Sequence, residues 1–292
     1  MSHQNEVPPS FRAPPLSCDA HFHIFGPAER YPYGAGTNES LRYAPPLAPL
    51  SEYLEVAKVL GVERFVFVQP SAYGRDNACM LDAMREVGVA RCRGIVDVDE
   101  NAPDALLADM DKLGVRGVRI NVSPVKPPAP GFSASMRRRI ERLEARCAEM
   151  GWQLDFLQPG WLTEELLPVF ARLRCSFTIA HMGMFRAEAG PQQPGMRKLI
   201  DLLRHGEGRA WVKFTGTYRM ATEPTFADAA PMARALIEAA PDRLIWGSDY
   251  PHLSFADKVG SVQLFNLLAD WAPDEAMRRR ILVDNPAALF GF

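Results

Sequence analysis

Five side chains suited to metal binding or proton transfer follow apolar runs in the sequence. His21 and His23 stand one residue apart in "SCDAHFHIFGP". His181 follows "SFTIA", and Asp249 follows "RLIWGS" with His252 three residues later. Alternate residues of a strand point the same way, so we expect the imidazoles of His21 and His23 on one face.

These residue types allow two kinds of chemistry. Imidazole nitrogens and a carboxylate are suitable ligands for Zn²⁺, Mn²⁺ or Fe²⁺, and a catalytic site leaves one position open for water. The same groups accept and donate protons in general acid–base catalysis. A lone HxH pair is equally typical of hydrogen-bonded histidines in a core. The combination with His181 and Asp249, both at expected strand ends, favours a functional site.

Eight short and mostly apolar segments have the character of parallel strands that are buried on both faces. Segments with helical periodicity lie between them, at about 30 residues per strand-helix unit. This alternation predicts an α/β fold, a single (β/α)8 TIM barrel, whose active site lies at the carboxyl ends of the strands. The expected strands are residues 16–23, 64–69, 93–98, 117–122, 152–157, 176–181, 211–215 and 243–249.

The helix boundaries are predicted from capping residues. Ser51 and Thr163 are expected to be N-caps, and Gly61 is expected to end the helix that Ser51 begins. Further helices are expected over residues 76–88 and 133–151, the second with a stripe formed by Met136, Ile140, Leu143 and Cys147.

Two segments stand outside this alternation. Residues 1–16 are rich in proline and are expected to form a flexible leader, with residues 17–292 forming the barrel. Residues 25–49 contain five prolines and three tyrosines without helical periodicity. A long loop after a barrel strand is a candidate lid, and the alternative is a packed surface excursion.

Composition restricts the function further. The chain is 47% hydrophobic and 23% charged with a net charge of −2, which gives no basic surface for nucleic acid or an anionic membrane. The five cysteines have no CxxC spacing, which argues against disulfides and a thiolate zinc site. No signal peptide or spanning segment is apparent, so we expect a cytoplasmic enzyme with a small-molecule substrate.

The motifs resemble those of a known family. "DAHFH", "AHMG" and "WGSDYPH" look like the amidohydrolase superfamily. "CDAHFHIFGPAERYPY", "VQPSAYGRDN", "GVRINV" and "NPAALF" are similar, in the same order, to the 2-pyrone-4,6-dicarboxylate lactonase branch. The resemblance implies a lactonase that opens a ring in the catabolism of aromatic compounds.

The resemblance also bears on the metal. Binuclear members carry a lysine on strand 4 and a histidine on strand 5, where this chain has Arg119 and either Asp155 or Gln158. We therefore expect at most one divalent metal, zinc or manganese, on His21, His23 and Asp249, with or without His181. The dicarboxylate lactonases work without metal, so metal-independent hydrolysis is the alternative.

The cationic residues predict an anionic substrate. Arg119, Lys126, Lys213 and Arg219 could converge on the barrel mouth, and guanidinium groups bind carboxylates in bidentate fashion.

In the lactonases, residues that match Arg119 and Arg219 hold the substrate carboxylates, and one that matches Ser71 donates a hydrogen bond. Met184 replaces an arginine after "HMG", so the substrate is expected to differ from the pyrone dicarboxylate itself. The resemblance leaves three candidate types of substrate: 2-pyrone-4,6-dicarboxylate-like, muconolactone-like and sugar-acid lactones.

We expect Asp249, assisted by His252, to act as the general base for hydrolysis. His181 and the HxH pair would polarise the lactone carbonyl and stabilise the oxyanion, with or without a metal. The alternatives are a metal-dependent decarboxylase of the same superfamily and a non-catalytic barrel that binds an anionic ligand.

Overall fold

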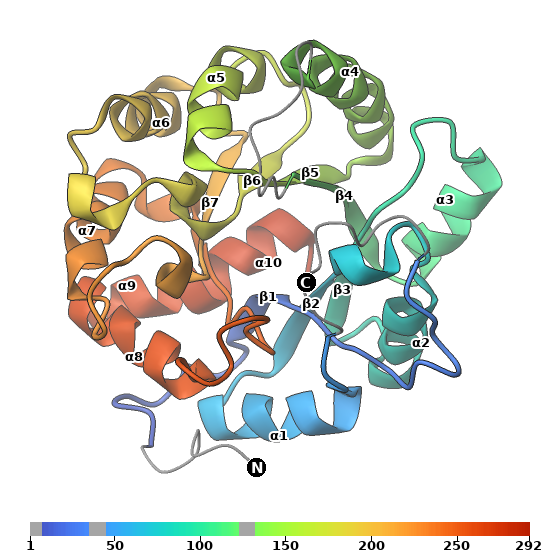
Figure 1. The fold of residues 1–292 in the computed structure, drawn as a ribbon, viewed down its shortest axis with the longest axis horizontal. Coiled ribbons are helices and arrows are strands. Elements are labelled where there is room, and N and C mark those ends of the chain that lie inside the picture. The colour runs from blue at the N-terminus through green and yellow to red at the C-terminus, as the bar shows by residue number, and fades with distance from the viewer. Residues whose placement is uncertain (1–7, 35–44, 123–131) are drawn as a thin grey trace.

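The structure is a computed structural model that describes residues 8–34, 45–122 and 132–292. Eight parallel strands pair in the order of the chain, and the helices surround them (Figure 1). Each strand overlaps one predicted range, and the predicted TIM barrel is confirmed. The strands are β1 (Cys18–Phe22), β2 (Arg64–Val68), β3 (Cys92–Val96), β4 (Val115–Asn121), β5 (Gln153–Leu157), β6 (Phe177–Ile179), β7 (Ala210–Phe214) and β8 (Leu244–Trp246).

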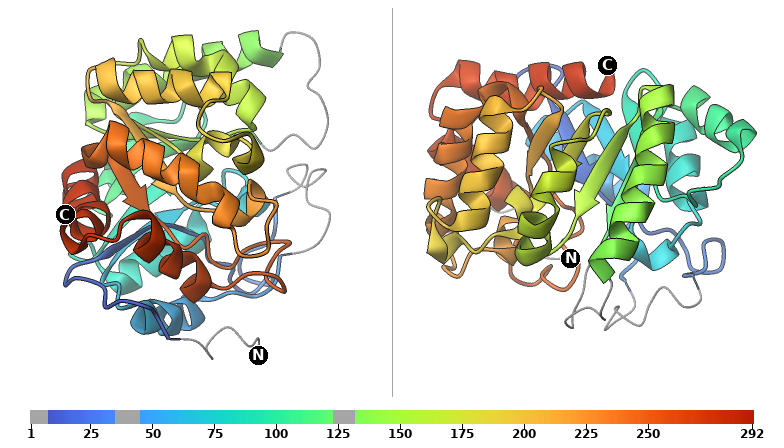
Figure 2. Two further views of the ribbon diagram at one scale, coloured as in Figure 1. Left: turned by 90° about the vertical axis from the view of Figure 1, so that its left-hand side faces the viewer. Right: turned by 90° about the horizontal axis from the view of Figure 1, so that it is seen from above.

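The helices follow the strands in sequence, three of them coming after β8, and lie outside the strands in space. Two further views show them packed side by side around the sheet (Figure 2). They are α1 (Leu50–Leu60), α2 (Ala78–Val87), α3 (Asp104–Lys112), α4 (Phe132–Met150), α5 (Gly160–Phe170), α6 (Pro194–His205), α7 (Ala230–Ala239), α8 (Ser261–Trp271), α9 (Glu275–Arg279) and α10 (Asn285–Phe290). None of the helices in the described ranges has both the length and the apolar character needed to cross a membrane.

Two predicted helix caps are wrong. Ser51 is the second residue of α1, and Thr163 lies inside α5, because Pro49 and Pro159 precede these helices and serve as their N-caps in an extended conformation. A proline leaves no N–H of its own unsatisfied at a helix start, and neither of these helices has a side-chain cap hydrogen bond. Gly61 ends α1 with a φ of 74°, as predicted.

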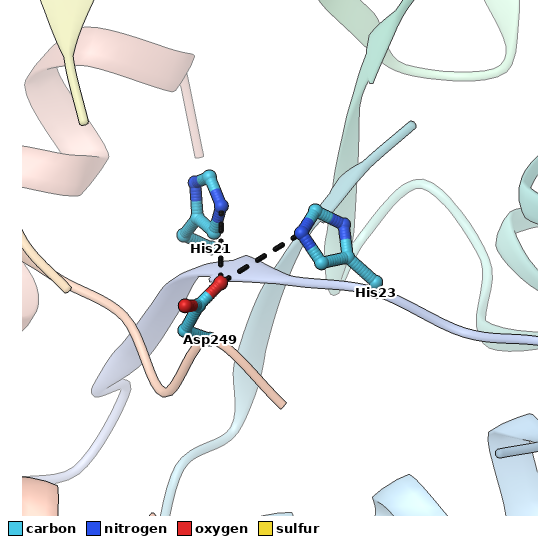
Figure 3. Close-up of side chains that lie close together, drawn as sticks. All are labelled: His21, His23 and Asp249. Atoms are coloured by element: carbon cyan, nitrogen blue, oxygen red, sulfur yellow. Dashed lines mark ion pairs between the residues drawn. The ribbon is translucent and has the colours of Figure 1, made fainter. Parts of the chain in front are cut away.

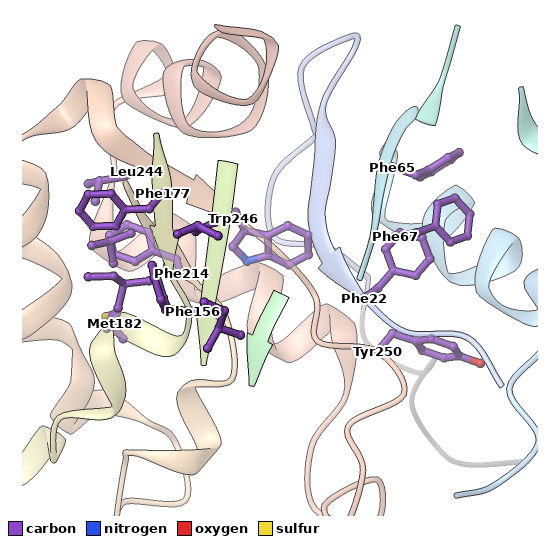
Figure 4. Packing of buried hydrophobic residues seen from close by; sticks show 14 of the residues in the cluster. Phe22, Phe65, Phe67, Phe156, Phe177, Met182, Phe214, Leu244, Trp246 and Tyr250 are labelled. Atoms are coloured by element: carbon purple, nitrogen blue, oxygen red, sulfur yellow. The ribbon is translucent and has the colours of Figure 1, made fainter. Parts of the chain in front are cut away.

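Aromatic side chains fill the space between the strands and the helices (Figure 4). Phe22 stacks on Tyr53 of α1, with their ring centroids 3.6 Å apart. On α4, the predicted stripe is buried at Ile140, Leu143 and Cys147. The opposite face of the sheet lines the barrel interior, where Cys18, Ala20, Val66, Val68, Ile95, Trp211 and Ile245 form a separate apolar cluster with Phe290.

The barrel closes between β1 and the segment after β8. The His23 N–H donates to the Tyr250 carbonyl, and the Asp249 N–H donates to the His21 carbonyl, both at 2.8 Å. Closure therefore brings the HxH pair and Asp249 together through backbone hydrogen bonds.

Residues 8–16, which we expected to be loose, contact the barrel. The ring of Phe11 stacks on Phe265 of α8 with centroids 4.4 Å apart, and the Ser10 N–H donates to Asn266 Oδ1 at 2.7 Å. The first seven residues of the predicted leader lie outside the described ranges.

The loop after β1 is tied at its base. Phe25 and Ala48 exchange two backbone hydrogen bonds, of 2.8 and 2.9 Å. Residues 35–44 lie outside the described residues, so the lid remains a prediction.

Candidate active site

A bulge in β1 aims the HxH pair into the barrel. The β1–β2 register shifts between Asp19 and Phe22. Ala20 faces the interior, and simple alternation would turn the next residue, His21, outward. The bulge brings His21 inward as well, where its Nδ1 lies 3.3 Å from Lys213 Nζ. Asp19 fixes the bulge by accepting hydrogen bonds from the His21 and Ser248 N–H groups, at 3.2 and 2.9 Å.

Three imidazoles surround the carboxylate of Asp249. Its Oδ1 lies 3.6 Å from His21 Nε2 and 3.7 Å from His23 Nε2 (Figure 3). Its Oδ2 lies 3.9 Å from His181 Nε2. All four residues are buried. The structure thus brings together the histidines and the acid that the sequence places at separate strand ends.

The remaining contacts of Asp249 come from the turn after β7. Tyr218 Oη donates to Oδ2 at 2.5 Å, and Arg219 Nε donates to the same oxygen at 3.2 Å. Sequence reasoning missed Tyr218, although its position beside Arg219 in "GTYR" was a usable signal. Arg219 is predicted to bind the substrate. In the structure its Nε donates a hydrogen bond to Asp249, the predicted general base. Its side chain is still 27% exposed.

These contacts set the protonation states at the site. Burial would raise the pKa of Asp249, but Arg219, the histidines and Tyr218 outweigh it and lower this pKa well below its ordinary value. Burial lowers the pKa of His23 to about 3 and that of His181 to about 4. Near neutral pH the site therefore combines an ionised carboxylate with neutral imidazoles.

His252, which is predicted to assist Asp249, has other hydrogen-bond partners. Its Nε2 lies 3.1 Å from the Ser248 carbonyl oxygen and 3.3 Å from Ser261 Oγ. Within the described ranges it forms no ion pair with Asp249. His252 instead braces the turn that carries Asp249, because Ser248 directly precedes the acid.

Both loops that carry these residues have left-handed backbone. The φ angle is 52° at His181, 46° at Met182 and 57° at Met184, and it is 56° at Asp249 and 60° at His252. Such angles are unfavourable for residues other than glycine, and they cluster at functional sites where the surroundings enforce them.

Two glycines make room for the histidines. A Cβ on Gly216, whose φ is 55°, would overlap the His181 ring. A Cβ on Gly247 would lie 2.6 Å from both the N and the Cβ of His21. Neither glycine was predicted, because their neighbours are close in space but distant in sequence.

Lys213 is not at the mouth, as we had expected, but is fully buried beneath His21. It forms an ion pair with Asp155 Oδ2, which also accepts a 2.7 Å hydrogen bond from Thr178 Oγ1. A charged residue inside an apolar strand needs such a partner, so "WQLDFL" and "WVKFT" contained the signal for this pair. Arg119 is buried beside them, and its Nη1 donates to the Gln69 carbonyl at 2.6 Å.

The remaining predicted substrate contacts are Ser71, Met184 and Lys126. Ser71 is half-buried directly after β2, in the 3₁₀ turn Ser71–Tyr73. Met184 is half-buried and packs against the hydrophobic core. Lys126 lies outside the described residues.

The residues around Asp249 fit one divalent metal. Ligand atoms of His21, His23 and Asp249 all lie within 4.8 Å of one another. His21 Nε2 is buried and has no hydrogen-bond partner in the described part of the chain. Neutral imidazoles and an ionised carboxylate are the states that bind metal. Among the residues that the structure describes, no second group of possible ligands lies close together, and Asp155 is paired with Lys213.

Comparison with known proteins agrees with this fold and identifies the family. The amidohydrolase family model matches residues 18–292, and the chain belongs to this family. It is 37% identical to 4-sulfomuconolactone hydrolase of Hydrogenophaga intermedia, over 97% of this chain and 91% of that protein. It is 28% identical to 2-pyrone-4,6-dicarboxylate hydrolase of Comamonas testosteroni, over 98% and 93%.

A solved structure is similar to this protein in both fold and sequence. A putative 2-pyrone-4,6-dicarboxylic acid hydrolase from Pseudomonas putida superposes with a TM-score of 0.80 at 31% identity, covering 94% of this chain and 97% of that one. The similarity to named lactone hydrolases confirms the prediction of a ring-opening hydrolase.

Proposed function

We propose that the protein hydrolyses a small lactone that carries an anionic group, with Asp249 as the general base. One observation supports this most strongly. The Asp249 carboxylate is buried, ionised and surrounded by neutral imidazoles at the end of the barrel where this fold carries active sites. Tyr218 and Arg219 bind Oδ2, so Oδ1 is the oxygen that is free to accept a proton from water.

The proposed reaction has two steps. Water attacks the lactone carbonyl carbon while Asp249 takes a proton from the water, and the carbonyl oxygen becomes an oxyanion. The ring C–O bond then breaks, and Asp249 returns the proton to the departing ring oxygen. The products are a carboxylic acid and a hydroxyl group on one open chain.

His181 would stabilise the oxyanion. His181 Nδ1 lies 2.6 Å from Thr215 Oγ1, which fixes the ring so that Nε2 faces the carboxylate. A metal on His21, His23 and Asp249 would supply Lewis-acid polarisation of the same carbonyl when bound.

The substrate class follows from the cations and the relatives. The relatives act, by name, on a sulfonated lactone and a pyrone dicarboxylate. We propose that Arg119 and the exposed part of Arg219 bind the anionic group, with Ser71 and Lys126 as further contacts. Met184 would add apolar surface where the lactonases have an arginine, which favours a muconolactone-like or sugar-acid lactone.

A lactone panel with purified, metal-analysed protein tests this proposal. We expect acid release and a product that has gained one water. Release of CO₂ from a carboxylated substrate would instead identify a decarboxylase. Binding of a lactone without turnover would identify a binding protein.

We also propose a cytoplasmic location. All five cysteines are free and buried, which is consistent with a reducing compartment.

A further inference from the structure

The two histidines of the HxH pair have different partners on Nδ1. His23 Nδ1 lies 2.8 Å from the Val68 carbonyl oxygen. His21 Nδ1 lies 3.3 Å from the ammonium of Lys213. A carbonyl oxygen can only accept a hydrogen bond, and an ammonium can only donate one. His23 Nδ1 must therefore donate a hydrogen bond, and His21 Nδ1 must accept one.

These partners dictate opposite tautomers. His23 must carry its proton on Nδ1, which leaves a lone pair on Nε2. His21 must accept on Nδ1, so the neutral ring carries its proton on Nε2, the atom that faces Asp249 Oδ1 at 3.6 Å. Metal-binding histidines normally donate their second ring N–H to an oxygen, as His23 does. His21 is held in the opposite state.

We infer that Lys213 weakens divalent-cation binding at His21, His23 and Asp249 by holding His21 in the Nε2–H tautomer. Lys213 has little freedom to release His21, because it is fully buried and ion-paired with Asp155, which Thr178 also holds. Its positive charge beneath His21 also repels a cation. Lys213 is thus a positioning residue that places the proton of His21 on Nε2. This effect does not depend on which lactone is the substrate.

A double variant tests the inference. Removal of Lys213 alone would leave the Asp155 carboxylate buried without a cation, and Asp155→Asn alone would leave the ammonium buried without an anion. The wild type therefore serves as the reference, and Asp155→Asn/Lys213→Met, which removes both charges of the pair, serves as the test. The dissociation constant for zinc chloride, measured by competition with a chromophoric chelator, should be lower in the double variant by about tenfold to a hundredfold.

The site of the tighter binding is checked by adding Asp249→Asn, which should restore weak binding. Zinc binding that is no tighter in the double variant than in the wild type would overturn the inference, and so would tight binding that persists without Asp249.

A second measurement needs no variant and covers the case in which the double variant does not fold. Nitrogen-15 NMR of the imidazoles in metal-free wild-type protein should show His21 protonated on Nε2 and His23 on Nδ1. A proton on Nδ1 of His21 would overturn the inference.

Discussion

The interior of the barrel has an amino-end half and a carboxyl-end half, and the same strands supply both. In the amino-end half, apolar residues such as Ala20, Val66 and Ile245 pack against Phe290. In the carboxyl-end half, the buried side chains are ionisable and include His21 and Lys213. On β7, Trp211 belongs to the apolar cluster, and Lys213 is the next residue on the same face.

The amino-end half provides stability, and the carboxyl-end half provides the groups for chemistry. Burial of apolar surface stabilises the fold, whereas burial of charge costs free energy unless it is paired. The carboxyl-end half adds strained backbone to that cost at His181 and Asp249. Substitutions in the two halves should therefore separate stability from activity.

Phe290→Ala should give the largest loss of stability. Phe290 is 1% exposed in the amino-end half, so its truncation should lower the free energy of unfolding by about 3–5 kcal/mol. The turnover of the folded fraction should stay at the wild-type value. Chemical denaturation and kcat per folded molecule check this. Lost turnover with unchanged stability would show that the amino-end half contributes to activity rather than to stability.

Gly216→Ala should act mainly on activity. The new methyl group would displace His181, and a displacement of about 1 Å at a reacting group can cost about 100-fold in kcat. Gly291→Ala is the matched control, because Gly291 also has left-handed backbone, with a φ of 68° and a ψ of 51°, but no atom within 4 Å of the added Cβ.

Both glycine variants should lose about 1–2 kcal/mol of stability from the left-handed backbone. Only Gly216→Ala should lose turnover. Equal kcat values for the two variants would show that the position of His181 is unimportant.

Substitutions of Arg119 and Arg219, the two arginines of the carboxyl-end half, should affect different kinetic parameters. Arg119→Met and Arg219→Gln should each reduce kcat/KM by an amount equivalent to about 1.5–3 kcal/mol, the usual range for hydrogen bonds to charged groups. Arg119→Met should act through KM. Arg219→Gln should also lower kcat, because Arg219 is bonded to Asp249.

Arg64→Gln provides the comparison from the amino end, where the guanidinium of Arg64 lies over the Phe292 ring. Its kcat/KM should equal that of the wild type. A similar loss in all three variants would mean that the arginines act through folding rather than through the substrate.

The fold was predictable because buried parallel strands leave apolar runs that can be counted, and the polar residues after them marked the site. Contacts between strands were not predictable. The β1 bulge depends on pairing with β2, and Lys213 finds Asp155 only in the closed barrel. The contact of Arg219 with Asp249 likewise depends on how two loops meet.

Met184→Arg should have the smallest effect. Met184 is half-buried, and a partly exposed charge pair is worth about 0.5–1 kcal/mol, so activity on a dicarboxylated pyrone relative to monocarboxylated lactones should rise about two- to fivefold. The ratio of kcat/KM values for the two substrate types measures this. An unchanged ratio would remove Met184 from the substrate pocket.

The role of Asp249 in activating water in the carboxyl-end half is tested by the kcat of Asp249→Asn. Asparagine keeps the size of the side chain but cannot accept the proton, so kcat should fall by about 100-fold or more. Circular dichroism should show a folded protein, and substrate binding should change little. Near-normal turnover by this folded variant would show that Asp249 does not activate the water.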